Sequence, residues 1–275
     1  MTAVFCHNAA DRKAGTWKKQ LEPFTSLEFA VSDAAKGIGS AVAQVANARL
    51  DDPSAATLGH GLDVFHTTME AHRVLARRWR RGEAAWDEAE AADAKVAAAK
   101  QRGIDARGMA QTARSAWTKA TASFEEAEGL ESAWGQAHAA LDLFLPTARS
   151  TTDPAEAEIA AALKGLPGPD WAKVRNFLND PRSLTFLDRM HRRLTTAEPR
   201  TDWREAMVWR WWLPHSRPTT ADPVTGLVRV VGRDRELSEE EHASYDRVAA
   251  VLEDTFRASS AVECLNSVLR MQQSR

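Results

Sequence analysis

The sequence has few cysteines and no long apolar segment, and each of these absences excludes a class of protein. Its two cysteines, Cys6 and Cys264, stand near opposite ends of the 275 residues, without the paired spacing of a disulfide framework or a cysteine-based zinc site. No apolar run approaches the roughly 18 residues that span a bilayer, and no signal segment opens the chain. We therefore expect a soluble, cytoplasmic protein with reduced thiols and no membrane partner.

The chain also lacks an excess of charge of either sign. Lys and Arg number 36 against 38 Asp and Glu, which gives a formal net charge of -2. A balance of this kind does not mark the whole chain as a nucleic-acid binder, so any basic surface must be local. With 44% hydrophobic residues, the chain is long enough to bury one large core or two modest ones.

The N-terminal part alternates between strand-like and helix-like patterns. Apolar runs and period-two alternation indicate strands, whereas apolar residues spaced three and four apart indicate helices. The order is strand, helix, strand, helix, strand over residues 3–6, 15–23, 27–33, 34–49 and 62–66. This order predicts an α/β segment with a parallel or mixed sheet.

The middle of the chain is rich in Ala, Glu, Arg and Lys, and predicts long helices. Residues 69–145 favour antiparallel helical hairpins whose tryptophans point inward. These expected anchors are Trp79, Trp86, Trp117 and Trp134. Further helices follow to about Trp212, and a last helix begins near Ser238, where Ser-Glu-Glu-Glu fits a capping box.

Two acidic residues stand where they could carry chemistry. Asp33 closes a predicted strand, at the rim where open α/β sheets bind their ligands; the plain alternative is an ordinary helix N-cap. Glu263 shares a helix face with Ser259, Asn266 and Arg270 beside an apolar stripe, and its plain alternative is a solvated surface residue. The pattern of each residue by itself favours the plain alternative.

Three segments, taken together, resemble motifs of DDE-type transposases. Residues 257–270 (Arg-Ala-Ser-Ser-Ala-Val-Glu-Cys-Leu-Asn-Ser-Val-Leu-Arg) resemble the helix that carries the final catalytic Glu, and residues 29–37 resemble the strand and turn of the second catalytic Asp. Asp63-Val64-Phe65-His66 resembles the signature of Asp or Cys, two residues and His, which precedes a large helical insertion in several transposase groups. The intervening stretch matches only in position and helical character.

This resemblance implies an α/β fold: a partial ribonuclease H-like core interrupted by a large all-α insertion, mostly helical by residue count. Residues 1–66 would form the α/β part of the core and residues 67–235 the insertion. Residues 236–275 would form the closing helix that carries the last acidic residue.

The resemblance also implies a site and a reaction. Asp33 and Glu263 would be ligands of Mg2+ (or Mn2+), and His66 would lie beside them as an orienting group. Intact relatives cut and join DNA strands by two-metal phosphoryl transfer, in which one ion activates the nucleophile and the other stabilises the leaving oxygen.

One departure from the family pattern limits this expectation. The family requires an earlier Asp on the first strand, and Asp11, the only acid between Met1 and Glu22, lies in a predicted turn. Both ends of the sequence also look cut. We therefore expect a fragment that binds Mg2+ weakly or not at all and does not cleave DNA alone, because divalent-ion affinity depends on the number of charged ligands.

Local clusters of basic and aromatic residues are the expected contacts with double-stranded DNA, such as transposon ends. They are Arg77, Arg78, Arg80, Arg81, His191, Arg192, Arg193, Trp209, Trp211, Trp212 and Arg270. The alternative for these clusters is solvated basic helix faces and a Trp-rich core. A homo-oligomer, and association with the nucleoid when DNA is bound, are further expectations.

Two other functions stay open at this point. The chain could be a non-catalytic remnant that binds DNA or an intact transposase. It could also be a helical scaffold, in which case Asp33, Asp63, His66 and Glu263 would be scattered in space.

Overall fold

The computed structural model describes residues 13–32, 35–52, 54–141, 152–215 and 237–255, and the side chains at positions 152 and 212–215 lie outside this description. The chain divides into two compact units. One comprises residues 1–66, 139–157 and 176–275, and the other residues 67–138 and 158–175.

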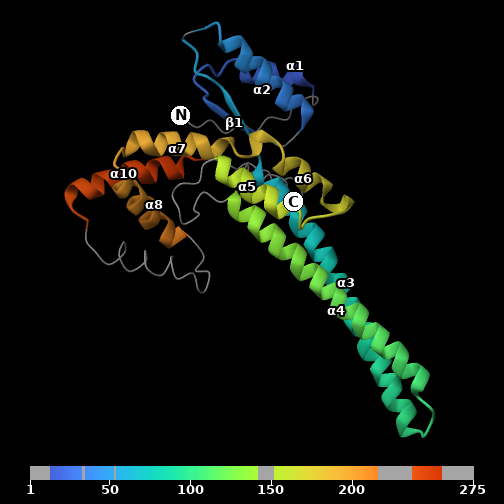
Figure 1. The fold of residues 1–275 in the computed structure, drawn as a ribbon. Helices are drawn as coiled ribbons and strands as arrows, with labels where there is room; N and C mark the ends of the chain where they lie inside the picture. The colour runs from blue at the N-terminus through green and yellow to red at the C-terminus, as the bar shows by residue number, and fades with distance from the viewer. Residues whose placement is uncertain (1–12, 33–34, 53, 142–151, 216–236, 256–275) are drawn as a thin grey trace, which may run out of the picture. The chain divides into compact units, whose positions relative to one another are not determined.

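Helices dominate the described residues, and a two-stranded parallel sheet accompanies them (Figure 1). The elements are α1 (Ala14–Leu21), β1 (Phe29–Ser32), α2 (Lys36–Arg49), β2 (Gly59–Leu62), α3 (Val64–Gln101), α4 (Arg107–Ala140), α5 (Thr152–Leu163), η1 (Pro169–Trp171), α6 (Ala172–Leu178), η2 (Pro181–Ser183), α7 (Thr185–Ala197), α8 (Thr201–His215) and α10 (Glu239–Glu253). None of these described helices is long and apolar enough to cross a membrane.

The sheet is formed by β1 and β2, which are joined through α2. Phe29 pairs with Gly59 and Ser32 with Leu62, in parallel register. The strand expected at residues 27–33 is therefore confirmed over Phe29–Ser32. Because the strands are parallel, their carboxyl ends lie at the same edge, where the Asp63 amide donates a 2.8 Å hydrogen bond to the Ser32 carbonyl.

The prediction of a strand over residues 62–66 is wrong. β2 ends at Leu62, and Val64 already begins α3. The physical reason is local: the Asp63 carboxylate accepts a 2.9 Å hydrogen bond from the Phe65 amide, which is how an acid caps a helix. The strand itself contains Gly59 and Gly61, and glycine weakens the strand signal in a sequence.

Helices α1 and α2 pack together beside the sheet. Together with the segments before each strand they form one buried apolar cluster, which comprises Leu21, Leu27, Ala41, Val42, Val45 and Leu58. The buried Arg49 binds the carbonyl oxygens of Leu27 and Phe24 at 2.7 Å and that of Ala56 at 3.1 Å. Its guanidinium thus donates hydrogen bonds to backbone carbonyls in the segment after α1 and in the segment after α2. Buried carbonyl groups need such partners.

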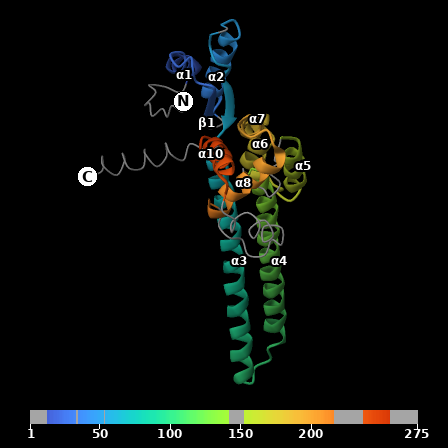
Figure 2. The same cartoon turned by 90° about the vertical axis from the view of Figure 1, so that its left-hand side faces the viewer.

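The long helices α3 and α4 run side by side as an antiparallel hairpin (Figure 2). Buried alanines recur at every seventh residue from the position before α4 onward, at Ala106, Ala113, Ala120 and Ala127. This heptad spacing keeps one narrow stripe against the partner helix. The predicted hairpin is confirmed.

The tryptophans of the hairpin behave differently from one another. Trp134 is buried, as expected, with 4% of its surface exposed. Trp86 is 41% exposed, so its predicted inward position is wrong. Its ring lies edge-on to that of Trp117, with 4.7 Å between the ring centroids. The buried residues at this level are alanines, and Trp117 packs against them from the side.

Helices α7, α8 and α10 pack against one another. Helix α10 begins with the predicted capping box, in which Glu241 and Ser238 exchange side-chain and backbone hydrogen bonds. This expectation is confirmed because a capping box depends only on residues within one helical turn.

Candidate functional site

The carboxyl edge of the parallel strands carries a paired acid and histidine. The Asp63 side chain is fully buried, and its Oδ2 lies 2.8 Å from Nδ1 of His66, which is 51% exposed. Asp63 stands directly before α3, and His66 lies three positions later in the first turn of this helix. The start of the helix therefore brings the two side chains together. The Asp-x-x-His spacing read from the sequence thus corresponds to a direct contact.

This contact determines the chemistry that His66 offers. A carboxylate can only accept, so the neutral His66 ring carries its proton on Nδ1 and has Nε2 as its acceptor atom. Such a carboxylate–imidazole pair fixes the tautomer and ring orientation of histidines that bind metals or move protons. Asp63 is therefore a positioning residue for His66.

A second histidine supports the sheet on β2. His60 Nε2 lies 2.8 Å from the Ser32 hydroxyl, and its Nδ1 lies 3.4 Å from Nη1 of Arg182. Because a guanidinium only donates, Nδ1 must accept and Nε2–H donates to Ser32. Burial, and then the charge of Arg182, lower the pKa of His60 to about 4. His60 is thus a neutral ring that holds the end of β1.

Arg182 is itself held in place by Asp180. Its guanidinium makes two hydrogen bonds to the Asp180 carboxylate, at 2.9 and 2.6 Å. These bonds lower the pKa of Asp180. A Cβ atom at Gly39 would lie 2.9 Å from Arg182 Nη1, so the glycine of α2 makes room for this arrangement.

The expected metal ligands Asp33 and Glu263 lie outside the described residues. In the sequence, Asp33 follows Ser32, the last residue of β1. Among the described residues, no group of three or more His, Cys, Asp or Glu side chains could hold a metal ion. At the sheet edge, both Asp63 oxygens already hold Phe65 and His66.

The expected DNA contacts have different surroundings. Arg78 forms ion pairs with Glu126 at 3.0 Å and with Asp170 at 2.9 Å. Both acids belong to the same compact unit as Arg78. In contrast, Arg77, Arg80 and Arg81 are exposed.

The remaining expected contacts differ: Arg192 is exposed and His191 is half-buried, whereas the described tryptophans are buried. Trp209 and Trp211 are each only 8% exposed, which fits a role in packing. Arg193 pairs with Asp254 at 2.7 Å. Arg270 and the Trp212 side chain lie outside the described residues.

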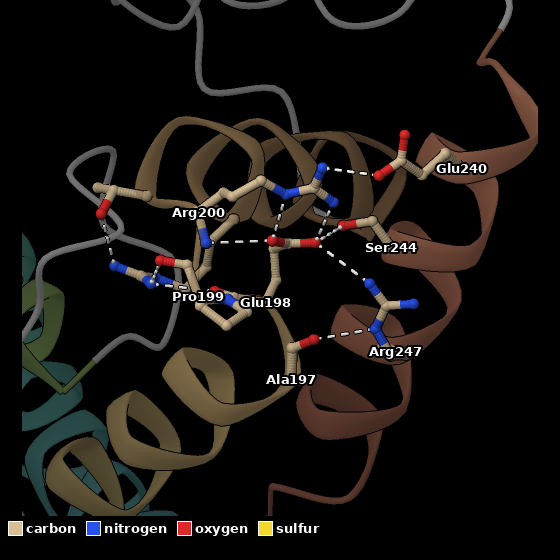
Figure 3. A network of polar contacts seen from close by, with 9 residues as sticks. Ala197, Glu198, Pro199, Arg200, Glu240, Ser244 and Arg247 are labelled. Carbon is tan, nitrogen blue, oxygen red and sulfur yellow. Dashed lines mark hydrogen bonds and ion pairs between the residues drawn. The ribbon is translucent and has the colours of Figure 1, made fainter.

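A polar network that the sequence analysis did not single out surrounds Glu198, between α7 and α8 (Figure 3). Glu198 is 1% exposed. Its carboxylate accepts hydrogen bonds from Arg200 at 2.8 and 3.0 Å, from Ser244 at 2.7 Å and from Arg247 at 3.2 Å. The pKa of Glu198 is lowered, first by the hydrogen bonds from Arg200.

The Glu198 network joins three helices of one unit. Arg247 also donates to the Ala197 carbonyl at 2.9 Å, and Arg200 reaches Glu240 at 2.8 Å (Figure 3). The only local signal in the sequence was the spacing of Glu198 and Arg200 around Pro199. Both oxygens of the buried Glu198 carboxylate accept hydrogen bonds from the protein itself, which indicates a structural role.

We compared the chain with protein-family models, curated proteins and solved structures, and none of them matches it.

Proposed function

We propose that this chain is part of a DDE-type transposase, in which Asp33 and Glu263 are metal ligands and His66 is an orienting group. The observation that carries the proposal is the contact between Asp63 and His66 at the carboxyl edge of the β1–β2 pair. The motif lies directly after a strand and opens a long helix, which is the context that the resemblance implied for it.

The geometry of the strands supports a shared site at this edge. Ligands of open α/β sheets bind beyond the carboxyl ends of the strands. The hydrogen bond between the Asp63 amide and the Ser32 carbonyl joins the ends of β1 and β2.

The proposed metal ions have a simple role. Bound Mg2+ would lower the charge repulsion between a nucleophilic oxygen and the DNA phosphate and would stabilise the leaving oxygen. The protein would contribute the carboxylates of Asp33 and Glu263 and the orientation of His66 by Asp63. Double-stranded DNA is the substrate that this function implies.

Cleavage of the protein backbone by a bound iron ion tests the proposed metal site. The test does not require that the protein carry out transposition. Because a site that lacks one of three carboxylates binds a divalent ion weakly, Fe2+ is added in large excess in place of Mg2+. Ascorbate with peroxide then generates hydroxyl radicals that cut the backbone beside the bound ion. We expect fragments that end near residues 33, 63–66 and 263. Asp33→Asn and Glu263→Gln should each weaken all three cuts, because one site produces them. Asp51→Asn, at an exposed position after α2, should leave them unchanged.

Two results would count against this function. Cuts spread evenly along the chain would mean that no metal site exists. Cuts near residue 33 that persist in Glu263→Gln would mean that the two acids do not share a site. In both cases the helical-scaffold alternative would replace the transposase proposal.

A further inference from the structure

The exposed face of α3 carries separated charges. Between residues 73 and 81 the sequence has five arginines and no acid, and between residues 83 and 93 it has five acids and no base, with Gly82 between the two halves. Lys119 of α4 pairs with Glu88, and Glu126 pairs with Arg78. On the opposite side of the helix, Arg73 pairs with Glu70 of the same helix.

That opposite side forms a regular stripe. Its residues are exposed and recur at spacings of four and three, at Arg73, Arg77, Arg80, Ala84, Asp87, Ala91 and Ala94. Spacings of three and four place these residues on one face of the helix. Within the described part of the chain, Arg77, Arg80 and Asp87 make no ion pair.

We propose that this face of α3 binds the same face of a second copy of the chain, in antiparallel orientation. A two-fold axis beside Glu83 and Ala84 would place Arg80 of each copy at the height of Asp87 of the other, because both residues are equally distant from that point. The contact is self-complementary, as a two-fold interface requires. The short Ala84 side chain at its centre lets the two helices approach.

Charge complementarity favours a second copy over DNA at this face. DNA is negative along its whole length, so it would attract the arginine half and repel the acidic half. A reversed copy meets both halves with opposite charge. The proposal uses residues of the hairpin alone and does not depend on the transposase function.

A charge swap gives a sharp test. Arg80→Glu would place acids opposite acids in its own dimer, and Asp87→Arg would place arginines opposite arginines. We expect each variant alone to dimerise at least about tenfold more weakly than the unchanged chain of 30.3 kDa. An equal mixture of the two should form a one-to-one dimer of near-original affinity, since both cross-pairs are then opposite in charge.

Sedimentation equilibrium measures the mass, and circular dichroism shows that the variants keep their helices. Arg114→Glu and Glu125→Arg are matched controls, because both positions are exposed on α4 and lie off the stripe; they should leave the dimer unchanged.

Three results would overturn the proposal. They are a monomer at every concentration, a dimer that neither variant weakens, and a mixture that fails to restore the dimer. Loss of DNA binding by Arg80→Glu at unchanged mass would assign the face to DNA.

Discussion

The Ser244 hydroxyl donates a 2.7 Å hydrogen bond to the Glu198 carboxylate and so joins residues 46 positions apart in the sequence. Glu198 follows the last residue of α7, and Ser244 lies in α10. Both side chains are buried. A buried carboxylate costs free energy unless donors surround it, and here Arg200, Ser244 and Arg247 supply them.

Glu198→Gln should lower the free energy of unfolding by about 2 kcal/mol, because buried charged donors would lose their anion. Urea unfolding followed by circular dichroism measures this change. Glu240→Gln is the matched control: Glu240 also bonds to Arg200 but is 71% exposed, so water can replace it. Equal effects of the two substitutions would contradict the structural role of Glu198.

The same network makes the free energy of unfolding depend on pH. The hydrogen bonds from Arg200 and Ser244 hold the pKa of Glu198 below its ordinary value of 4.5. A carboxyl group whose pKa is lower in the folded state stabilises the fold above its unfolded pKa, and this stabilisation is lost as the pH falls. The stability difference between the unchanged protein and Glu198→Gln should therefore shrink below about pH 4.5. A constant difference would contradict this.

The His60 side chain should stay neutral above about pH 5. Its pKa is lowered from 6.5 to about 4 by burial and by Arg182. Its neutral form therefore stabilises the fold fully above pH 6.5, and this contribution declines as the pH falls toward about 4. NMR titration should show no shift of the His60 ring signals above about pH 5, and His60→Gln should flatten the pH dependence of stability over this range.

Two glycine-to-alanine substitutions should have opposite effects. A Cβ atom at Gly165 would lie 2.6 Å from the Cβ of Ala133, a contact that no rotation of either side chain relieves. Gly165→Ala should therefore lower the melting temperature. Gly129→Ala, inside α4 with nothing within 4 Å of the new atom, should raise stability by up to about 1 kcal/mol. Thermal unfolding of both variants measures this, and the same sign for both would contradict the packing described.

The elements that the sequence predicted well depend on neighbours along the chain. The alternation of residues 27–33 predicted β1, and the Ala-rich, strand-poor composition predicted α3 and α4. Asp63 and His66 were singled out only through the resemblance; their contact depends on α3 beginning at Val64, where a strand had been predicted. The start of α3 was misjudged because Val64 and Phe65 favour strands, and the Asp63 cap outweighed that preference.

The sequence by itself determined the local elements, the capping box at Ser238 and the spacing of the Asp63–His66 pair, because each depends on residues within a few positions. Only the tertiary structure decided which charges are buried and with whom they pair. Arg78 looked like its basic neighbours, yet it reaches Asp170, 92 positions away. Nothing in the sequence singled out Glu198, yet it is buried and bound to Ser244 of α10. Such pairings depend on how distant helices pack, and short-range pattern in the sequence does not encode that packing.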